Sequence, residues 1–165
     1  MAALTIRAAH PANARHRYQD QDSPLTLAEG LDEYYRVNGE RVSRPSTLPP
    51  ESMALFRSHD TCHVIFGLDT TLEDEAVVDT RTLLSCDVGF ARYAEYLTSD
   101  KQTKAIFKQV GYFTVLMGTL RAVPRLARAL IEKFRMPKKW PWVPPQSFYG
   151  RTLADLRREY GIRVI

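Results

Sequence analysis

Two histidines and two acidic residues near the middle of the chain have the types and spacing of a metal site. His59, Asp60 and His63 fall within five positions, and Glu75 follows twelve positions after His63. Residues four apart on a helix lie one turn apart on the same side, so the two histidines would point the same way. Asp60 would lie about 60° from His63 around the helix axis. Two imidazoles with one or two carboxylates suit Zn²⁺ or another divalent first-row ion, and leave room for a water or a substrate oxygen.

A turn of the chain is needed to bring the glutamate to the histidines. We expect one helix from about Glu51 to Gly67, because prolines suit its entry and a glycine suits its left-handed end. A short loop follows, and a threonine can cap a second helix predicted from about Leu72 to Leu97. A loop of four or five residues makes successive helices antiparallel neighbours. Glu75, in the first turn of the second helix, would therefore face His63.

Several roles in this region are left open by the spacing alone. A histidine pair on a helix can also be a hydrogen-bonded part of the core. Asp60 could be a direct ligand, or the carboxylate that orients a histidine ligand. Asp79, one turn after Glu75, could face the same site or the solvent. Cys62 could bind a soft metal or pack as a small side chain, and the spacing of Cys62 and Cys86 does not fit a zinc ribbon.

The rest of the chain predicts an all-α, single-domain bundle of about six to seven helices, because no stretch shows sustained period-two alternation. Residues 1–22 show little periodicity and predict a flexible tail before a helical domain of residues 23–165. Helices are expected over Ser23–Asn38, with a Thr26/Glu29 capping box, over Lys101–Gly118, over Arg125–Phe134 after a kink or break at Pro124, and in a last short segment between Thr152 and Gly161. Met136 to Gly150, with four prolines and two tryptophans, predicts an extended arm.

Length and composition predict one globular domain. A chain of 165 residues has no room for a second sizeable core. It is 44% hydrophobic and 25% charged, which is an ordinary globular balance. The two cysteines, together with the lack of a secretory apolar region, favour a reducing, cytoplasmic compartment. No apolar run approaches the roughly 20 residues that a membrane-spanning helix needs, so we expect no spanning segment.

Basic charge is concentrated in the last quarter of the chain. Residues 1–120 carry a net charge of −4 and residues 121–165 a net charge of +8. This asymmetry predicts an anionic partner. No recognised nucleic-acid motif accompanies the charge, so nucleic acid is not expected to be that partner.

The basic residues include a stripe at helical spacing. Arg121, Arg125 and Arg128 recur at i, i+4 and i+7 with apolar residues between them, as in a helix lying on an anionic membrane leaflet. Trp140 and Trp142 extend this pattern, because indole favours the headgroup level. The alternative is a solvated basic face on an ordinary core helix. The sequence therefore offers these three arginines as candidates for binding a lipid headgroup.

The pattern His59-Asp60-x-x-His63-x(11)-Glu75 resembles the signature of the coenzyme Q protein four family of ubiquinone biosynthesis. Gly67 looks like the glycine of that signature, and the ending from Gly150 to Ile162 resembles the family's C-terminal segment. The resemblance covers roughly residues 24–165. The chain departs from the family at Asp74, where a glycine is usual, and its N-terminal part is short.

This resemblance implies a helical protein that binds a divalent metal, usually taken as zinc, through His59, Asp60, His63 and Glu75. It implies peripheral attachment to the inner face of a membrane and a prenylated quinone precursor or isoprenoid lipid as ligand. The implied reaction is a metal-dependent, oxidative decarboxylation that replaces the C1 carboxylate of the ring with a hydroxyl. The alternative is a non-catalytic, prenyl-lipid-binding scaffold for a biosynthetic complex, and a homodimer is also open. A metal-dependent phosphohydrolase ranks last, because no histidine follows His63 to complete its ligand set.

Overall fold

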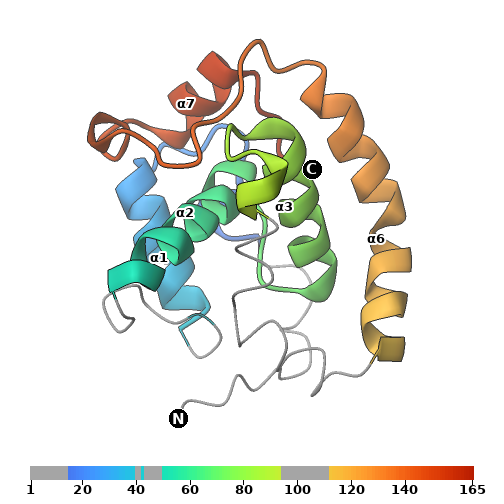
Figure 1. Ribbon diagram of the computed structural model, residues 1–165. Coiled ribbons are helices and arrows are strands. Elements are labelled where there is room, and N and C mark those ends of the chain that lie inside the picture. Colours follow the sequence, from blue (N-terminus) through green and yellow to red (C-terminus); the bar gives the residue numbers. More distant parts are fainter. Residues whose placement is uncertain (1–14, 40–41, 43–49, 94–111) are drawn as a thin grey trace.

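The computed structural model describes residues 15–39, 42, 50–93 and 112–165 of the chain. Within these ranges the regular secondary structure is helical, with two isolated bridges and no strand (Figure 1). The predicted all-α, single-domain fold is therefore confirmed. The site depends on α2 and α3, and the other helices hold this pair in place.

Helix α1 (Leu27–Val37) forms where its capping signals lie. The Thr26 side chain accepts a hydrogen bond from the backbone N–H of Glu29, and the Glu29 carboxylate accepts one from the Thr26 N–H, so the capping box is complete. The expected inward face is confirmed, because Leu27, Leu31 and Tyr34 are buried. The predicted Thr26/Glu29 capping box is confirmed, and the helix begins directly after this cap at Leu27 rather than at Ser23.

A short loop joins α2 (Pro50–Phe66) to α3, which begins at Leu72. Gly67 has φ +70°, as expected for the residue that ends a helix in the left-handed conformation. A Cβ atom there would lie 2.7 Å from Val164 Cγ1, so the position has no room for a side chain. Thr71 caps α3 by accepting from the backbone N–H of Asp74. These local signals fix where α2 stops and where α3 starts.

Helix α3 (Leu72–Ser85) ends well before the predicted boundary at Leu97. The backbone N–H of Trp140 donates to the Ser85 carbonyl at 2.8 Å, and the Asp87 N–H donates to the Trp140 carbonyl at 3.1 Å. The C-terminal arm thus takes up backbone groups that a longer helix would use. Gly89 follows with φ +76°, a conformation outside the helical region. Residues 94–97 of the prediction lie outside the described part.

Helix α6 (Tyr112–Lys133) packs along α3 on one side of the molecule (Figure 1). It continues through Pro124, where the sequence predicts a kink or a new helix starting at Arg125. A proline inside a helix removes one hydrogen bond, and packing against α3 offsets that loss here. A helix is also expected over Lys101–Gly118, and the part of it up to residue 111 lies outside the described residues. No helix of the described ranges has the length and hydropathy needed to span a bilayer.

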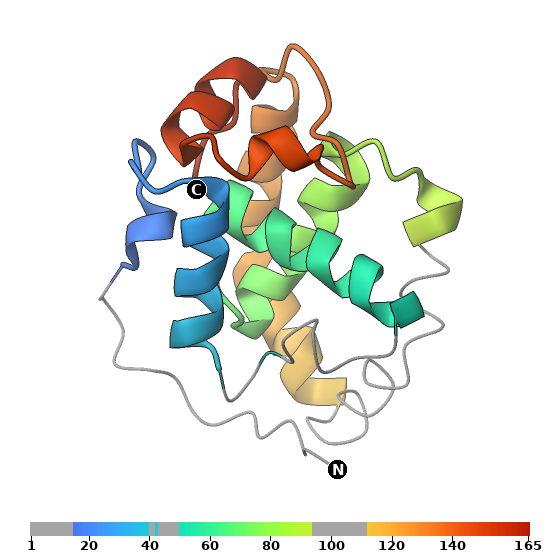
Figure 2. The same ribbon diagram turned by 90° about the vertical axis from the view of Figure 1, so that its left-hand side faces the viewer.

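The C-terminal arm and α7 (Leu153–Tyr160) cover one end of α1 and α2 (Figure 2). The arm includes a 3₁₀ turn, η3 (Gln146–Phe148). Thr152 caps α7, and Gly161 ends it with φ +64°, both as predicted. Trp140 and Trp142 are 0% and 2% exposed, so the expectation that they lie at a membrane headgroup level is wrong. Their indoles belong to the core.

Arg157 of α7 ties the two ends of the domain to α2. Its guanidinium is buried and donates to the carbonyls of Tyr18, Val64 and Ile65 at 2.6–2.9 Å. Tyr18 lies in the 3₁₀ turn η1 (Arg17–Gln19) and is fully buried. The prediction of a flexible tail over residues 1–22 is therefore wrong for residues 15–22, and residues 1–14 lie outside the described part.

Candidate metal centre

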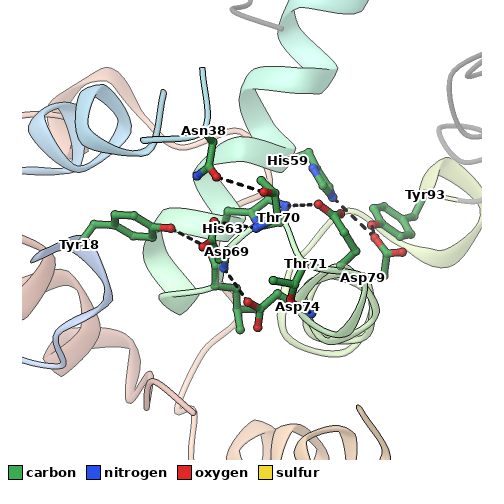
Figure 3. A network of polar contacts seen from close by, with 12 residues as sticks. Tyr18, Asn38, His59, His63, Asp69, Thr70, Thr71, Asp74, Asp79 and Tyr93 are labelled. Atoms are coloured by element: carbon green, nitrogen blue, oxygen red, sulfur yellow. Dashed lines mark hydrogen bonds and ion pairs between the residues drawn. The ribbon is translucent and has the colours of Figure 1, made fainter. Parts of the chain in front are cut away.

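Helices α2 and α3 bring two histidines and two acids face to face, and Figure 3 shows His59, His63 and Asp79 of this group. His63 Nε2 lies 3.5 Å from Glu75 Oε1, and His59 Nε2 lies 3.6 Å from Asp79 Oδ1. The later residue of α2 therefore faces the earlier residue of α3, which is the register of antiparallel helices. The two histidines are four residues apart on α2, and the two acids are four residues apart on α3. All four side chains therefore lie along the line where the two helices meet.

Three of these side chains form a group that could hold a metal ion. One potential ligand atom from each of His59, His63 and Glu75 lies within 4.8 Å of the others. The two imidazole rings are 4.8 Å apart between centroids and nearly perpendicular, at 77°. The sequence-based prediction that Glu75 returns to the histidines is thus confirmed.

His63 is the most deeply placed member of the group. It is fully buried, and the Tyr34 ring stacks on it at 5.3 Å. Neither of its ring nitrogens has a hydrogen-bond partner in the described part of the chain. Its distance of 3.5 Å to Glu75 is beyond an ordinary N–H···O bond. A buried polar atom without a partner costs about 1–3 kcal/mol, so this imidazole is suited to binding something else.

Asp60 is hydrogen-bonded to another helix and is not part of this group. Its carboxylate Oδ2 accepts a hydrogen bond from the Tyr35 hydroxyl of α1 at 2.8 Å. Burial raises the pKa of Asp60 to about 6, although the positive charge of His59 and the Tyr35 hydrogen bond oppose that shift. Asp60 is not a member of the three-residue group, so the structure does not bring together all four predicted ligands.

Asp79 of α3 lies beside His59, with its Oδ1 3.6 Å from His59 Nε2. The Tyr93 hydroxyl donates a short hydrogen bond to Asp79 Oδ1, the oxygen that faces His59 (Figure 3). Burial lowers the pKa of His59, but contact with Asp79 and the charges of Glu75 and Asp60 outweigh it and raise the pKa to about 9. The structure thus places Asp79 beside His59, with 37% of its side chain exposed to solvent.

Asp74, where the resembling family usually has glycine, anchors the loop that ends at α3. Its Oδ2 accepts from the Asp69 backbone N–H at 3.1 Å, and its Oδ1 lies 2.5 Å from Arg125 Nη1 of α6. Arg125 also donates to the Ile165 carbonyl. The arginine stripe is therefore divided: Arg125 binds groups of its own chain, whereas Arg121 and Arg128 are exposed.

The two cysteines meet behind the site. Cys62 Sγ of α2 lies 3.8 Å from Cys86 Sγ at the end of α3, and both side chains are fully buried. Neither belongs to the group that could hold a metal, so the reading of Cys62 as a small packed side chain is confirmed. Burial raises the pKa of Cys86 well above its ordinary value. Sequence spacing gave no sign of this contact, because it depends on the early end of α3.

Comparison of the chain with known protein families, with curated protein sequences and with solved structures finds no match. The resemblance to the coenzyme Q protein four family therefore depends on the quoted motifs alone. What the geometry itself supports is a group of two buried histidines and one partly exposed glutamate on an antiparallel helix pair.

Proposed function

We propose that this protein binds Zn²⁺ through His59, His63 and Glu75, and that the bound ion serves a reaction on a prenylated aromatic acid. The observation that carries the metal-binding half is the pair of unsatisfied nitrogens on the buried His63. A zinc ion would convert that cost into a bond, because neutral imidazole is a preferred zinc ligand.

Ligand spacing supports this choice of ion. Zinc–nitrogen and zinc–oxygen bonds of about 2.0–2.1 Å in a tetrahedral site place neighbouring ligand atoms roughly 3.3 Å apart. The separation of His63 Nε2 and Glu75 Oε1 is 3.5 Å, close to that edge and too long for a good hydrogen bond. Three protein ligands are also the number found in catalytic zinc sites, where the fourth position takes water or substrate.

The chemistry that a bound divalent ion supplies is Lewis-acid polarisation of a substrate oxygen, here the ring carboxylate or phenol oxygen. Exchange of the carboxylate for a hydroxyl consumes one water and releases CO₂, two protons and two electrons. It therefore needs an oxidant, and we propose dioxygen, which would take up the two electrons and two protons and become hydrogen peroxide. The protein's own part is to hold the three ligands on two helices and to keep His63 away from solvent beneath Tyr34.

Metal binding is tested first. Protein produced without a His tag should contain about one zinc per chain by mass spectrometry of the metals, and Glu75→Ala should lose it. Glu73→Ala is the matched control, because Glu73 lies in the same first turn of α3 but outside the metal group. Wild-type protein that binds no divalent ion with useful affinity would overturn the proposal.

The reaction is tested separately. Zinc-loaded protein is incubated aerobically with a prenylated hydroxybenzoate, and the product is analysed for loss of CO₂ and gain of a hydroxyl oxygen. We expect turnover that His63→Ala abolishes. Zinc binding and prenyl-lipid binding without turnover would refute the enzyme and favour the scaffold.

The scaffold alternative is favoured by one observation on α6. Val123, Leu130 and Ile131 of this helix, and Phe134 directly after its end, are 47–75% exposed. Arg128, also exposed, precedes Ile131 by three positions and is its neighbour on the helix surface. An exposed apolar face next to arginines fits attachment to an anionic membrane surface. The protein should float with vesicles containing anionic lipid, Ile131→Asp should prevent this, and Val143→Asp on the arm is the matched control.

A further inference from the structure

We propose that Asp79 and Tyr93 hold His59 in the orientation in which it binds the metal ion. Asp79 is a positioning residue in this proposal and not a ligand. The inference rests on the proposed metal-binding function, and it concerns two residues that lie outside the resembling family's signature.

A series of contacts connects the core to the imidazole of His59. The Tyr93 hydroxyl donates to Asp79 Oδ1, and the same oxygen lies 3.6 Å from His59 Nε2. Figure 3 shows the Asp79 carboxylate between the phenol and the imidazole. Because one oxygen is shared, the phenol fixes where the carboxylate lies, and the carboxylate faces the ring of His59.

Tyr93, at the far end of this series of contacts, is held in place by the core. Tyr93 is fully buried, and its ring packs edge-to-face on Trp142 at 5.7 Å. The backbone N–H of Trp142 in turn donates to Asp87 Oδ1 at 2.7 Å. A buried tyrosine hydroxyl therefore holds the Asp79 carboxylate in one position. The arm that ends α3 early therefore also supports the carboxylate beside His59.

The two acids of α3 differ in how they meet the histidines. Glu75 belongs to the group whose ligand atoms all lie within 4.8 Å, whereas Asp79 does not. Asp79 faces His59 and accepts from Tyr93, and it lies outside that group. This division matches the common arrangement in which a metal-binding histidine has its second nitrogen held by a carboxylate.

The arrangement has a chemical consequence for the ring of His59. A carboxylate facing Nε2 favours the tautomer with its proton on that nitrogen. The lone pair then lies on the other ring nitrogen, and neutral imidazole with one free lone pair is the form that binds a metal ion. Removing the carboxylate would leave both tautomers and several ring orientations accessible, and would weaken binding without removing a ligand.

Zinc affinity tests the role of the carboxylate. In competition with a chromophoric chelator, Asp79→Asn should bind zinc 10- to 100-fold more weakly than wild type, as measured for such partners in other zinc proteins. Tyr93→Phe should weaken binding less, and the double variant should match Asp79→Asn because both act through one contact. Glu73→Gln, which removes a charge from the same helix outside the group, should leave affinity unchanged.

Two spectroscopic readouts separate positioning from ligation. With Co²⁺ in place of zinc, the visible d–d spectrum of Asp79→Asn should keep the wild-type bands, because the ligand set is the same. Nitrogen NMR of zinc-loaded wild type should assign the protonated nitrogen of His59 to Nε2. A changed cobalt spectrum would make Asp79 a ligand and overturn the proposal.

The failure of each idea is recognisable. If the wild-type protein does not bind zinc, the proposed function is refuted. Equal zinc affinity of wild type, Asp79→Asn and Tyr93→Phe would leave the metal site standing and sink the positioning role alone. If Asp79→Asn does not fold, Tyr93→Phe, which keeps the buried ring, still decides the matter by its affinity.

Discussion

Replacing Arg157 with methionine removes the donor that connects η1, α2 and α7. In the native chain its guanidinium binds carbonyls of Tyr18, Asp20, Val64 and Ile65. Burial lowers the pKa of Arg157 to about 10, so the group stays charged at neutral pH. Hydrogen bonds from a charged donor are the stronger kind, and here they end on carbonyls in the last turn of α2.

The size of the effect follows from which carbonyls lose their donor. The Val64 and Asp20 carbonyls also accept backbone N–H groups, whereas Arg157 is the donor for Tyr18 and Ile65. Two buried carbonyls at about 1–3 kcal/mol each give a loss of roughly 2–6 kcal/mol. Methionine no longer buries a charge, which offsets part of this loss. We therefore expect a destabilisation of about 3 kcal/mol, a large share of the ~5–15 kcal/mol of a typical domain.

Urea unfolding followed by circular dichroism measures this loss directly. Arg158→Met is the matched control, because Arg158 is the next residue of α7, its side chain is 72% exposed and it pairs within its own helix turn. That control should change stability by less than about 0.5 kcal/mol. If Arg157→Met unfolds at the same urea concentration as Arg158→Met, the reasoning about buried carbonyls is refuted.

Three further predictions concern the site and its supports. Metal-free protein should lose thermal stability as pH rises from about 7 to 9.5. The pKa of His59 is raised from 6.5 to about 9, so the stabilisation by its charge is complete below pH 6.5 and lost above pH 9. A His59→Asn variant should lack this decline, and a flat wild-type profile would contradict the prediction. Diamide should oxidise Cys62 and Cys86 to an intramolecular disulfide, since their sulfurs are 3.8 Å apart. The intact mass of the protein should fall by two hydrogens, which diamide gains. Two thiols that stay reduced would contradict this prediction. Gly67→Ala should destabilise by about 1–3 kcal/mol in urea unfolding because of its left-handed φ and the nearby Val164, and an equal result for Gly150→Ala, where a Cβ meets nothing within 4 Å, would refute this.

Signals that act within a few residues predicted the helix ends well. The Thr26 cap, the Gly67 and Gly161 stops and the return of Glu75 to His63 all follow from backbone chemistry and loop length. Such features need no knowledge of the rest of the fold. They fix the antiparallel pair, and with it three of the four predicted ligands.

Features set by distant segments could not be predicted in the same way. Asp60 is oriented by Tyr35, which comes from a different helix, so helical spacing gave no information about its direction. The end of α3 depends on Trp140, more than fifty residues later. The burial of that tryptophan is likewise a tertiary result, and composition alone made it resemble a membrane anchor.

The His-His-Glu group also bears on the rate at which the chain folds. All three residues lie in one stretch of seventeen positions, from His59 to Glu75. Closing a short loop costs little entropy, so an ion bound there could form its bonds before α6 and the arm are in place. Zinc would then stabilise the α2–α3 hairpin in the folding transition state and speed refolding, in addition to slowing unfolding. Stopped-flow refolding with and without zinc would separate these two contributions.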